Sequence, residues 1–356
     1  MRAGLTTVSA LRRSLVAAVF TILAAAAAAP QSAEDGARSP QGPIAAHNLH
    51  PLYTPFIQLQ PHRAETVGVN AISVFTYQSY GNNYLFDPAD GGEADVFVIL
   101  DSEASYTTLG ITWGIHERAE VNASIQAVAH YPGFLDASLE AYHDLFGFPN
   151  AARGSRPQND IRFYFETGDG IVLDEGDPVI DITALTLEPR LELFEGADGA
   201  FMLGLGAALK LPLAAPSIVL TAGGTDVALR VFADYTWPTA SLSVTTGVGY
   251  LSQPPYIPED RFLPWILPFS ASFEWMATDT LSVITTVSGN SSPFRLGYER
   301  SDRFTAIATM GGAIALNERV QLHAGLSEEF FTFAATDVAL HLAIDYRFAQ
   351  AWEPRQ

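Results

Sequence analysis

The chain has 356 residues, no cysteine and a formal net charge of −20, which comes from 39 acidic and 19 basic side chains. Hydrophobic residues make up 48% of the sequence and charged residues 16%. This excludes an intrinsically disordered chain, because disorder needs low hydrophobicity and high charge. The lack of cysteine excludes a disulfide-stapled scaffold and any cysteine-based metal or redox site. The negative charge argues against nucleic-acid binding, since a phosphate backbone would repel such a protein.

Residues 1–29 have the pattern of a secretory signal peptide. Three arginines precede an apolar, alanine-rich run over residues 15–29, and this run is shorter than the roughly 20 residues that a membrane-spanning helix requires. We expect cleavage between residues 28 and 33; an uncleaved N-terminal anchor is the alternative. Residues 30–64 are rich in proline, alanine and polar side chains, and we expect them to form an extended periplasmic lead-in.

The rest of the chain alternates between apolar and polar residues with a period of two. In the last such segment, Leu340, Leu342 and Ile344 share one face, whereas His341 and Asp345 share the other. Successive side chains of a β-strand point to opposite faces, so this alternation predicts strands with one apolar and one polar face. The pattern predicts twelve strands, over residues 65–78, 94–115, 119–131, 179–194, 200–212, 226–237, 240–251, 266–277, 280–289, 303–316, 320–331 and 337–348.

The connections between these segments alternate between short turns and longer loops. Outer-membrane barrels have short periplasmic turns, longer outside loops, an even number of strands and both termini in the periplasm. We therefore expect an all-β fold, a transmembrane antiparallel up-and-down β-barrel of 12 strands over residues 65–348, with a tail over residues 349–356. A soluble β-sandwich, whose strands also alternate, is the alternative.

The third long connection, residues 132–178, is the most unusual loop of the predicted barrel. A short helix is expected there, because Asp136 suits a helix N-cap and Gly147 suits a C-terminal cap. Strand-like pieces at 160–166 and 170–174 are expected to form a hairpin after the helix. The alternative counts them as spanning strands, which would break the alternation of short and long connections.

This helix has one apolar side, since its apolar residues recur at helical spacing. It is expected to form a lid or plug over the barrel mouth, with Arg153, Arg156 and Arg162 contacting acidic groups of the lumen. The alternative is a surface helix without a lid function, whose apolar side packs against the barrel rim or the outer leaflet. The residues assigned to the lid are Leu135, Leu139, Tyr142, His143, Phe146, Arg153 and Arg156.

The polar faces of the strands predict a charged barrel interior. Twelve strands enclose a space that is wider than an eight-stranded barrel but narrower than a general porin. Paired opposite charges there could block the lumen or line a narrow water path. The alternative is that these charged side chains form a solvated network with a structural role only. The residues expected to line the lumen are Glu188, Arg190, Glu192, Lys210, Arg230, Asp234, Glu274, His323, Glu329, His341, Asp345 and Arg347.

Two stretches of the sequence resemble an uncharacterised bacterial family. One runs from Phe134 through residues 145–150 to Pro157, and the other runs from Thr336 to Phe348. That family is catalogued as a domain of unknown function, and its members have signal peptides and predicted outer-membrane barrels. The resemblance therefore implies an outer-membrane β-barrel, and it brings no activity or catalytic residues with it.

The sequence favours a narrow channel for small solutes in the outer membrane of a Gram-negative bacterium, without enzymatic activity. A closed structural or surface-interaction barrel is one alternative. An outer-membrane lipid hydrolase is another, and it is disfavoured because the sequence has no His-x-Ser pairing with a supporting Asn. We expect no cofactor, metal or nucleic acid. The expected partners are outer-membrane lipids, lipopolysaccharide, the barrel-assembly machinery and a small solute.

Overall fold

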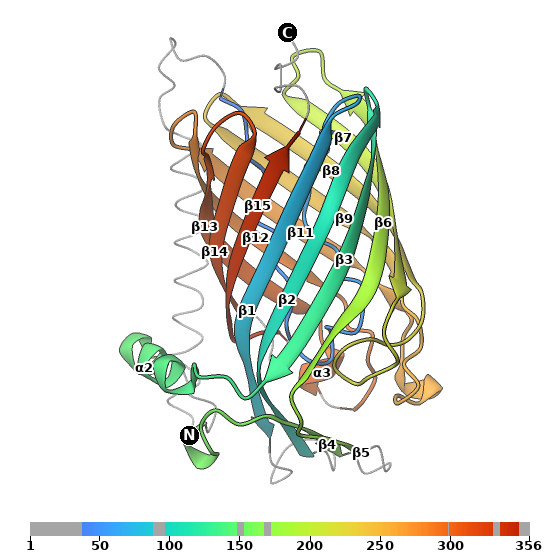
Figure 1. Cartoon of the computed structure of the whole chain (residues 1–356), viewed down its shortest axis with the longest axis vertical. Coiled ribbons are helices and arrows are strands. Elements are labelled where there is room, and N and C mark those ends of the chain that lie inside the picture. Colours follow the sequence, from blue (N-terminus) through green and yellow to red (C-terminus); the bar gives the residue numbers. More distant parts are fainter. Residues whose placement is uncertain are drawn as a thin grey trace.

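The computed structural model describes residues 38–87, 97–147, 153–166, 172–297, 299–329 and 335–348. Its strands form a closed antiparallel barrel (Figure 1). Among the described residues, twelve strands make the wall: β1 (Ile72–Asp87), β2 (Phe97–His116), β3 (Ala119–Tyr131), β6 (Val179–Glu195), β7 (Phe201–Pro212), β8 (Asp226–Trp237), β9 (Ala240–Tyr250), β11 (Pro268–Met276), β12 (Leu281–Asn290), β13 (Thr305–Ala315), β14 (Val320–Glu329) and β15 (Val338–Arg347). β1 pairs with β15 on one side and with β2 on the other, which closes the sheet. The prediction of a 12-stranded antiparallel barrel is confirmed.

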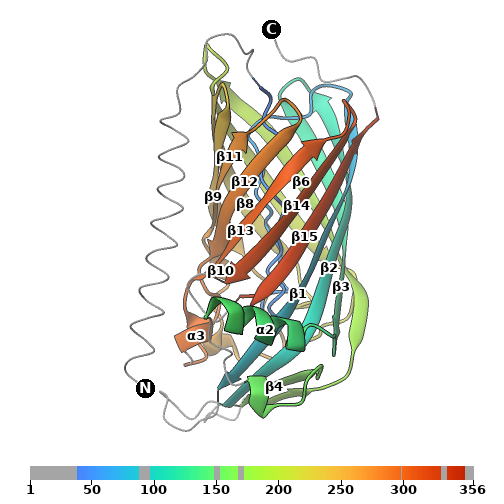
Figure 2. The same ribbon diagram turned by 90° about the vertical axis from the view of Figure 1, so that its left-hand side faces the viewer.

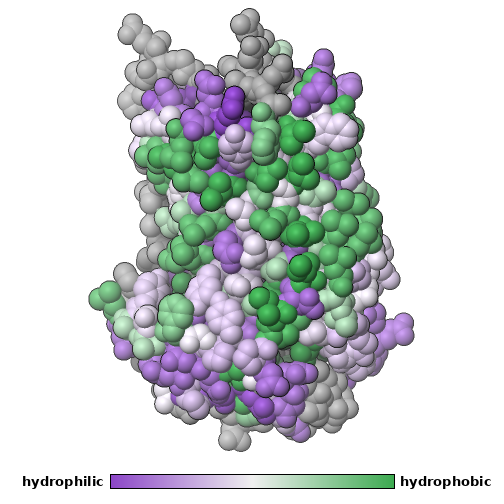
Figure 3. All heavy atoms as spheres, in the orientation of Figure 1, coloured by the Kyte–Doolittle hydropathy of each residue, from purple (hydrophilic) through white to green (hydrophobic). Residues whose placement is uncertain are grey.

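The outer surface of the wall is apolar. On β15, Leu340, Leu342 and Ile344 are 47–48% exposed, whereas His341 and Ala343 between them are buried. Hydrophobic residues gather over the middle of the face that Figure 3 shows, and hydrophilic residues gather toward both ends. A water-soluble sandwich would bury this apolar face, so that alternative is wrong; an exposed apolar band is what a barrel presents to lipid.

The connections alternate in length along the wall. Short turns join β2 to β3, β6 to β7, β8 to β9, β11 to β12 and β13 to β14, at what we call the short-turn end. The longer connections lie at the opposite loop end, which is the lower end in Figure 1. They carry α2 (Asp136–Phe146), the 3-10 helices Arg153–Ser155 and Glu259–Arg261, β10 (Trp265–Ile266) and α3 (Glu299–Asp302). Within the described ranges, no helix is both long and apolar enough to cross a membrane.

The third long connection contains a β-hairpin. Its strands, β4 (Arg162–Glu166) and β5 (Val172–Glu175), pair with each other, and β4 also pairs with Phe97–Asp101 of β2. The hairpin therefore extends the β1–β2 edge beyond the rest of the wall at the loop end. Neither strand enters the ring of twelve.

Residues 38–67, which we call the plug, run inside the barrel (Figure 2). The plug starts at the short-turn end, where the Arg38 N–H donates to the Pro238 carbonyl at 3.3 Å. It reverses direction in a series of turns over residues 51–56, near the loop end. It then returns to the short-turn end at Val67, from which the chain continues into β1.

The expectation of a periplasmic lead-in over residues 30–64 is therefore wrong for its described part. Residues 38–64 lie within the lumen, and their polar groups bond to the inner wall. A twelve-stranded barrel encloses more space than its own inward side chains fill. The plug occupies part of that space and is not a strand of the barrel.

Candidate functional site: the barrel interior

Carboxylates on the inner wall bind the backbone of the plug. The pairs are Glu274 with the N–H groups of Gln41 (2.7 Å) and Gly42 (2.9 Å), Asp226 with that of Ile57 (2.9 Å), Asp234 with that of Ala64 (2.7 Å), and Glu120 with that of Val67 (2.6 Å). An extended segment outside a sheet has no ladder partners for its N–H groups, and a buried N–H must find an acceptor. An ionised acceptor makes such a bond about twice as strong as a neutral one.

Wall cations complete this arrangement by donating to plug carbonyl groups. Lys210 donates to the Pro55 carbonyl, Arg230 to the Gln60 carbonyl (2.5 Å) and Arg190 to the Arg63 carbonyl (3.4 Å). The same cations form ion pairs with wall carboxylates, namely Lys210 with Asp226 (3.3 Å), Arg230 with Glu188 and Arg190 with Glu120. A buried charge is tolerated only when it is paired and hydrogen-bonded, and the plug supplies part of that bonding.

All twelve residues that the sequence predicted to line the lumen lie on the inward face of the wall. Eight of them are buried: Glu188, Glu192, Lys210, Arg230, Asp234, Glu274, His323 and His341. Four are half-buried: Arg190, Glu329, Asp345 and Arg347. Glu120 and Asp226 were not among the predicted residues, although both lie on the polar side of strongly alternating strands. That alternation was the signal that could have identified them.

A histidine of the plug and a histidine of the wall contact the same serine hydroxyl. His47 Nδ1 lies 2.8 Å from Ser79 Oγ, and His341 Nδ1 lies 2.7 Å from the same oxygen. The His47 ring also stacks on Tyr106, with 4.2 Å between the ring centroids, and its Nε2 lies 3.2 Å from Thr108 Oγ1. Burial, together with His341, lowers the pKa of His47 from 6.5 to about 3. His47 is therefore neutral while the plug is docked.

A second histidine pair lies closer to the loop end. His50 of the plug is buried, and His130 of β3 approaches Thr54 Oγ1 of the plug at 3.5 Å. Burial and the nearby His130 lower the pKa of His50 from 6.5 to about 3. Two plug histidines therefore face two wall histidines in a region that excludes water.

The tip of the plug forms an apolar stopper with the loops at the loop end. Its plug members are Leu49, Leu52, Tyr53, Phe56 and Ile57. They share one buried cluster with loop and strand residues that include Phe163, Phe165, Val219, Leu220, Ile257, Phe262, Phe294 and Leu296. Burying each such side chain contributes about 1.5–3 kcal/mol. The loop end is therefore closed by apolar packing, in contrast to the polar contacts along the rest of the plug.

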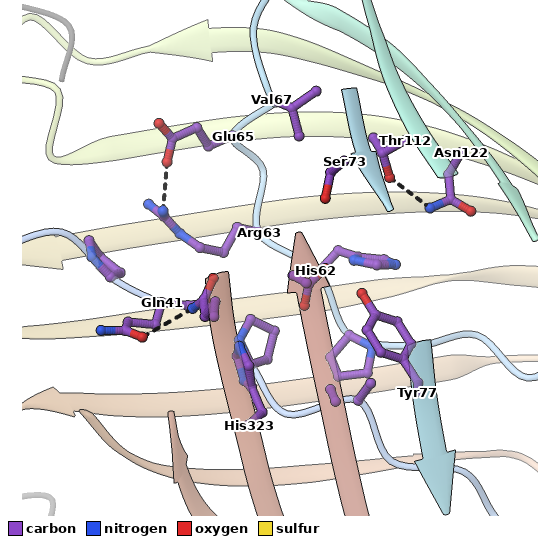
Figure 4. Close-up of a pocket in the computed structure, with 18 of the residues that line it drawn as sticks. Gln41, His62, Arg63, Glu65, Val67, Ser73, Tyr77, Thr112, Asn122 and His323 are labelled. Atoms are coloured by element: carbon purple, nitrogen blue, oxygen red, sulfur yellow. Dashed lines mark hydrogen bonds and ion pairs between the residues drawn. The ribbon is translucent and has the colours of Figure 1, made fainter. Parts of the chain in front are cut away.

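A cavity remains between the plug and the wall toward the short-turn end. Its volume is about 170 Å³. The two limbs of the plug line one side, and residues of β1, β2, β3, β6, β14 and β15 line the other. Figure 4 shows Tyr77 and His323 of the wall and His62 and Arg63 of the plug around this space. It is a part of the lumen that the plug does not fill.

The helix α2 lies beside the loop end of the barrel and does not cross the mouth (Figures 1 and 2). Gly147 ends it in the left-handed conformation, with φ of 73°, as expected. The expected N-cap is wrong: Leu135 takes the cap position, and no side chain bonds there. Asp136 instead accepts hydrogen bonds from Asn82 and from the backbone of Asn159.

The residues of this helix that were assigned to a lid differ in how deeply they are buried. Leu139 and His143 are buried, and Leu135 and Tyr142 are half-buried. Leu145, on the same helix, is 77% exposed. The backbone of Phe146 ends the helix, and its side chain lies outside the described part of the chain. The helix thus uses only a narrow side for packing.

The arginines of this loop bind acids at the loop end, and not the charged groups deeper in the lumen. Arg153 is buried and pairs with Asp136 (3.1 Å) and Asp337, and its guanidinium lies 4.5 Å from the ring centroid of Tyr84. The other pairs are Arg156 with Asp101 (3.5 Å) and Asp160 (2.8 Å), and Arg162 with Asp174 (2.7 Å). Arg153 therefore ties α2 to the start of β15.

Replacing Arg153 by alanine is expected to release the third connection from the wall. The change leaves Asp136 and Asp337 without their cation, and breaking a buried pair in this way costs about 3–5 kcal/mol. Limited proteolysis of the folded protein in detergent should then cut within residues 132–178 much faster than in the unchanged chain. Arg162→Ala is the matched control, because its pair with Asp174 is substantially exposed. Equal cleavage rates for both variants would contradict the anchoring role.

Residues 18–348 match the family described as "Protein of unknown function (DUF3187)". The chain belongs to this family. No curated protein matches it.

A solved structure similar to this DUF3187 barrel is an outer membrane channel. The outer membrane channel COG4313 from Pseudomonas putida F1 aligns with a TM-score of 0.52 and 12% identity, over 82% of this chain and 100% of that one. The KdgM porin aligns with a TM-score of 0.41 and 4% identity, over 78% and 99% of the two chains. At this level of identity the first likeness establishes the fold. The outer-membrane barrel family that the sequence resembled is confirmed.

Proposed function

We propose that this DUF3187 protein is an outer-membrane channel for small polar solutes, and that its own plug holds it closed. The observation that supports this proposal is that the charged lumen is occupied by a segment outside the β-sheet, bound through hydrogen bonds and ion pairs to the wall. Such a segment can move without breaking a single strand pair. The residues that line the lumen then have two roles, as plug ligands in the closed state and as a polar path in the open state.

The rest of the proposal concerns orientation and location. The apolar band would face lipid, with the short-turn end in the periplasm and the loop end outside, as in other outer-membrane barrels. Residues 1–29 would serve as the cleaved export signal. No catalytic activity is part of the proposal.

A permanently closed structural barrel is the second candidate, and the apolar stopper favours it. Its five plug side chains and the charge-assisted bonds along the plug, each contributing about 1.5–3 kcal/mol, make spontaneous release of the whole plug rare. A channel of this design needs a trigger, whereas a structural barrel needs none. The two candidates therefore differ in whether the plug ever leaves its docked position.

A disulfide between plug and wall tests the proposal. A Cβ atom built on Gly204 of β7 would lie 3.5 Å from the Cα atom of Ala64 in the plug, so the two Cα atoms are at most about 5 Å apart, within the range that a disulfide spans. The chain has no other cysteine, so Ala64→Cys with Gly204→Cys forms one defined bond. We expect the oxidised protein to show no channel openings in planar bilayers and to regain them after reduction.

The single variant Gly204→Cys is the control, and its openings should not respond to oxidation. Folding of each variant is checked by its mobility in detergent gels before and after boiling. Equal opening frequencies of the double variant in its oxidised and reduced forms would contradict plug movement. A folded protein that never opens in either form would support the structural barrel.

A further inference from the structure

The cavity beside the plug has the features of a binding site for a solute. It is lined by three arginines, Arg63, Arg190 and Arg347, and by two acids, Glu65 and Asp345. Hydroxyl and amide groups from β1, β2 and β3 complete the lining, namely those of Ser73, Tyr77, Thr112 and Asn122. A volume of about 170 Å³ leaves room for a small organic molecule.

The acids of the cavity already have cationic partners. Glu65 accepts from Arg63 at 2.6 Å, and Asp345 lies beside Arg347. Arg190 pairs with Glu120, which lies behind the cavity lining. A guanidinium has five N–H donors. A single carboxylate cannot accept hydrogen bonds from all five. Each arginine therefore still has N–H groups that can donate to a ligand after these pairs form.

The polar atoms left without a hydrogen bond around the cavity are nitrogens. Among the described lining residues, they are Nε of Arg190, Nδ1 of His323 and Nε of Arg63. Nε of Arg63 is already engaged in an ion pair, because it lies 3.6 Å from Asp234 Oδ2. His323 is 93% buried, and Figure 4 shows its ring beside the cavity. A buried donor without an acceptor costs about 1–3 kcal/mol. Arg190 Nε therefore indicates a ligand that brings acceptors, and His323 Nδ1 does so in the tautomer that carries the proton on Nδ1.

We propose that this cavity binds a small hydroxylated monocarboxylate on its way through the barrel. The carboxylate would accept from the arginines and from the Nδ1–H of His323, in the tautomer that protonates this nitrogen. The hydroxyl groups of the solute would bond to the hydroxyl and amide side chains of β1, β2 and β3. A cationic solute is disfavoured, because Glu65 is already paired with Arg63 and the positive charge of Arg347 acts on Asp345.

The proposal rests on the proposed channel function only for the passage of the bound solute. Binding is measured separately, by calorimetry on the folded full chain in detergent, with three probes of similar size and hydroxyl content. These are gluconate, which is an anion, sorbitol, which is neutral, and glucosamine, which is a cation. We expect gluconate to bind at least about tenfold more tightly than the other two, as a charge-assisted bond predicts.

Two substitutions connect this binding to the cavity. Arg347→Gln and His323→Phe should each weaken gluconate binding by about tenfold. Arg319→Gln removes the same charge from an exposed turn at the same end of the barrel and should leave binding unchanged. Equal affinity for sorbitol, preference for glucosamine, absence of gluconate binding or an unchanged affinity in Arg347→Gln would each overturn the proposal. Gluconate binding by a protein whose plug never moves would overturn only the channel function.

Discussion

Deleting residues 38–67 is expected to turn the closed barrel into a persistently open pore. The wall is closed by strand pairing between β1 and β15 and does not need the plug to complete its sheet. Without the plug, charged wall residues such as Glu274, Asp234 and Arg230 would bind water, and the lumen would conduct ions. In planar bilayers we expect a mean conductance about tenfold or more above that of the full chain.

A matched variant separates plug binding from the mere presence of a chain in the lumen. It replaces residues 38–67 by a glycine-serine segment of equal length, which keeps the tether but lacks the apolar tip and the proline-rich limbs. We expect this variant to conduct almost as well as the deletion, because a flexible segment has no preferred docked position. A deletion variant that folds, shifts its gel mobility on boiling and still conducts no more than the full chain would show that the wall and loops close the lumen by themselves.

Acidification is expected to open the full-length protein. The pKa of His47 and that of His50 are lowered from 6.5 to about 3 while the plug is docked, so the docked plug excludes protons that a released plug would take up. Docking is therefore strongest above pH 6.5, and it weakens progressively as the pH falls from 6.5 toward 3. Protonation of His47 would also place a cation beside the Ser79 hydroxyl, which contacts His341 as well.

The groups around His47 and His50 support the expectation that docking weakens as the pH falls. His47 contacts Ser79, Thr108 and Tyr106 and lies near His341; His50 lies near His130 and Tyr53. Burial and the partner histidine are the causes of both shifts, and both causes lower the pKa.

The measurement is the open probability in planar bilayers at pH 7.5 and at pH 5. We expect a rise of at least about tenfold in the unchanged protein on acidification. The double variant His47→Gln with His50→Gln keeps polar side chains of similar length but cannot take up a proton, so its response should be largely flat. His116→Gln, at the exposed end of β2, should respond like the unchanged protein. A double variant that still opens on acidification would assign the response to the wall carboxylates instead.

The strands could be predicted from the sequence where one face meets lipid and the other meets the lumen. The predicted ranges 119–131 and 226–237 coincide with β3 and β8. The first range, 65–78, is displaced, because β1 spans Ile72–Asp87. The C-terminal part of β1 extends past the wall at the loop end. It pairs there with β2, and Asn82 and Asn83 are buried in this part. No apolar outer face is required there, so the alternation on which the prediction depended is lost.

The inward-facing residues were also predictable, and their partners were not. Glu274 and Asp234 could be placed on a polar face from the period of two alone, because that period sets which side of a strand each residue occupies. Their ligands in the plug lie 232 and 170 residues away in the chain. No local pattern connects such distant positions.

A closed barrel with an apolar outside and a charged inside follows from the order of the residues, because each spanning strand repeats that division along its length. The occupied interior follows only from contacts between distant segments of the folded chain. The wall carboxylates bind backbone N–H groups of the plug, and every residue except proline has such a group. Because these contacts use the backbone of the plug and not its side chains, the sequence of the plug gives no sign of them.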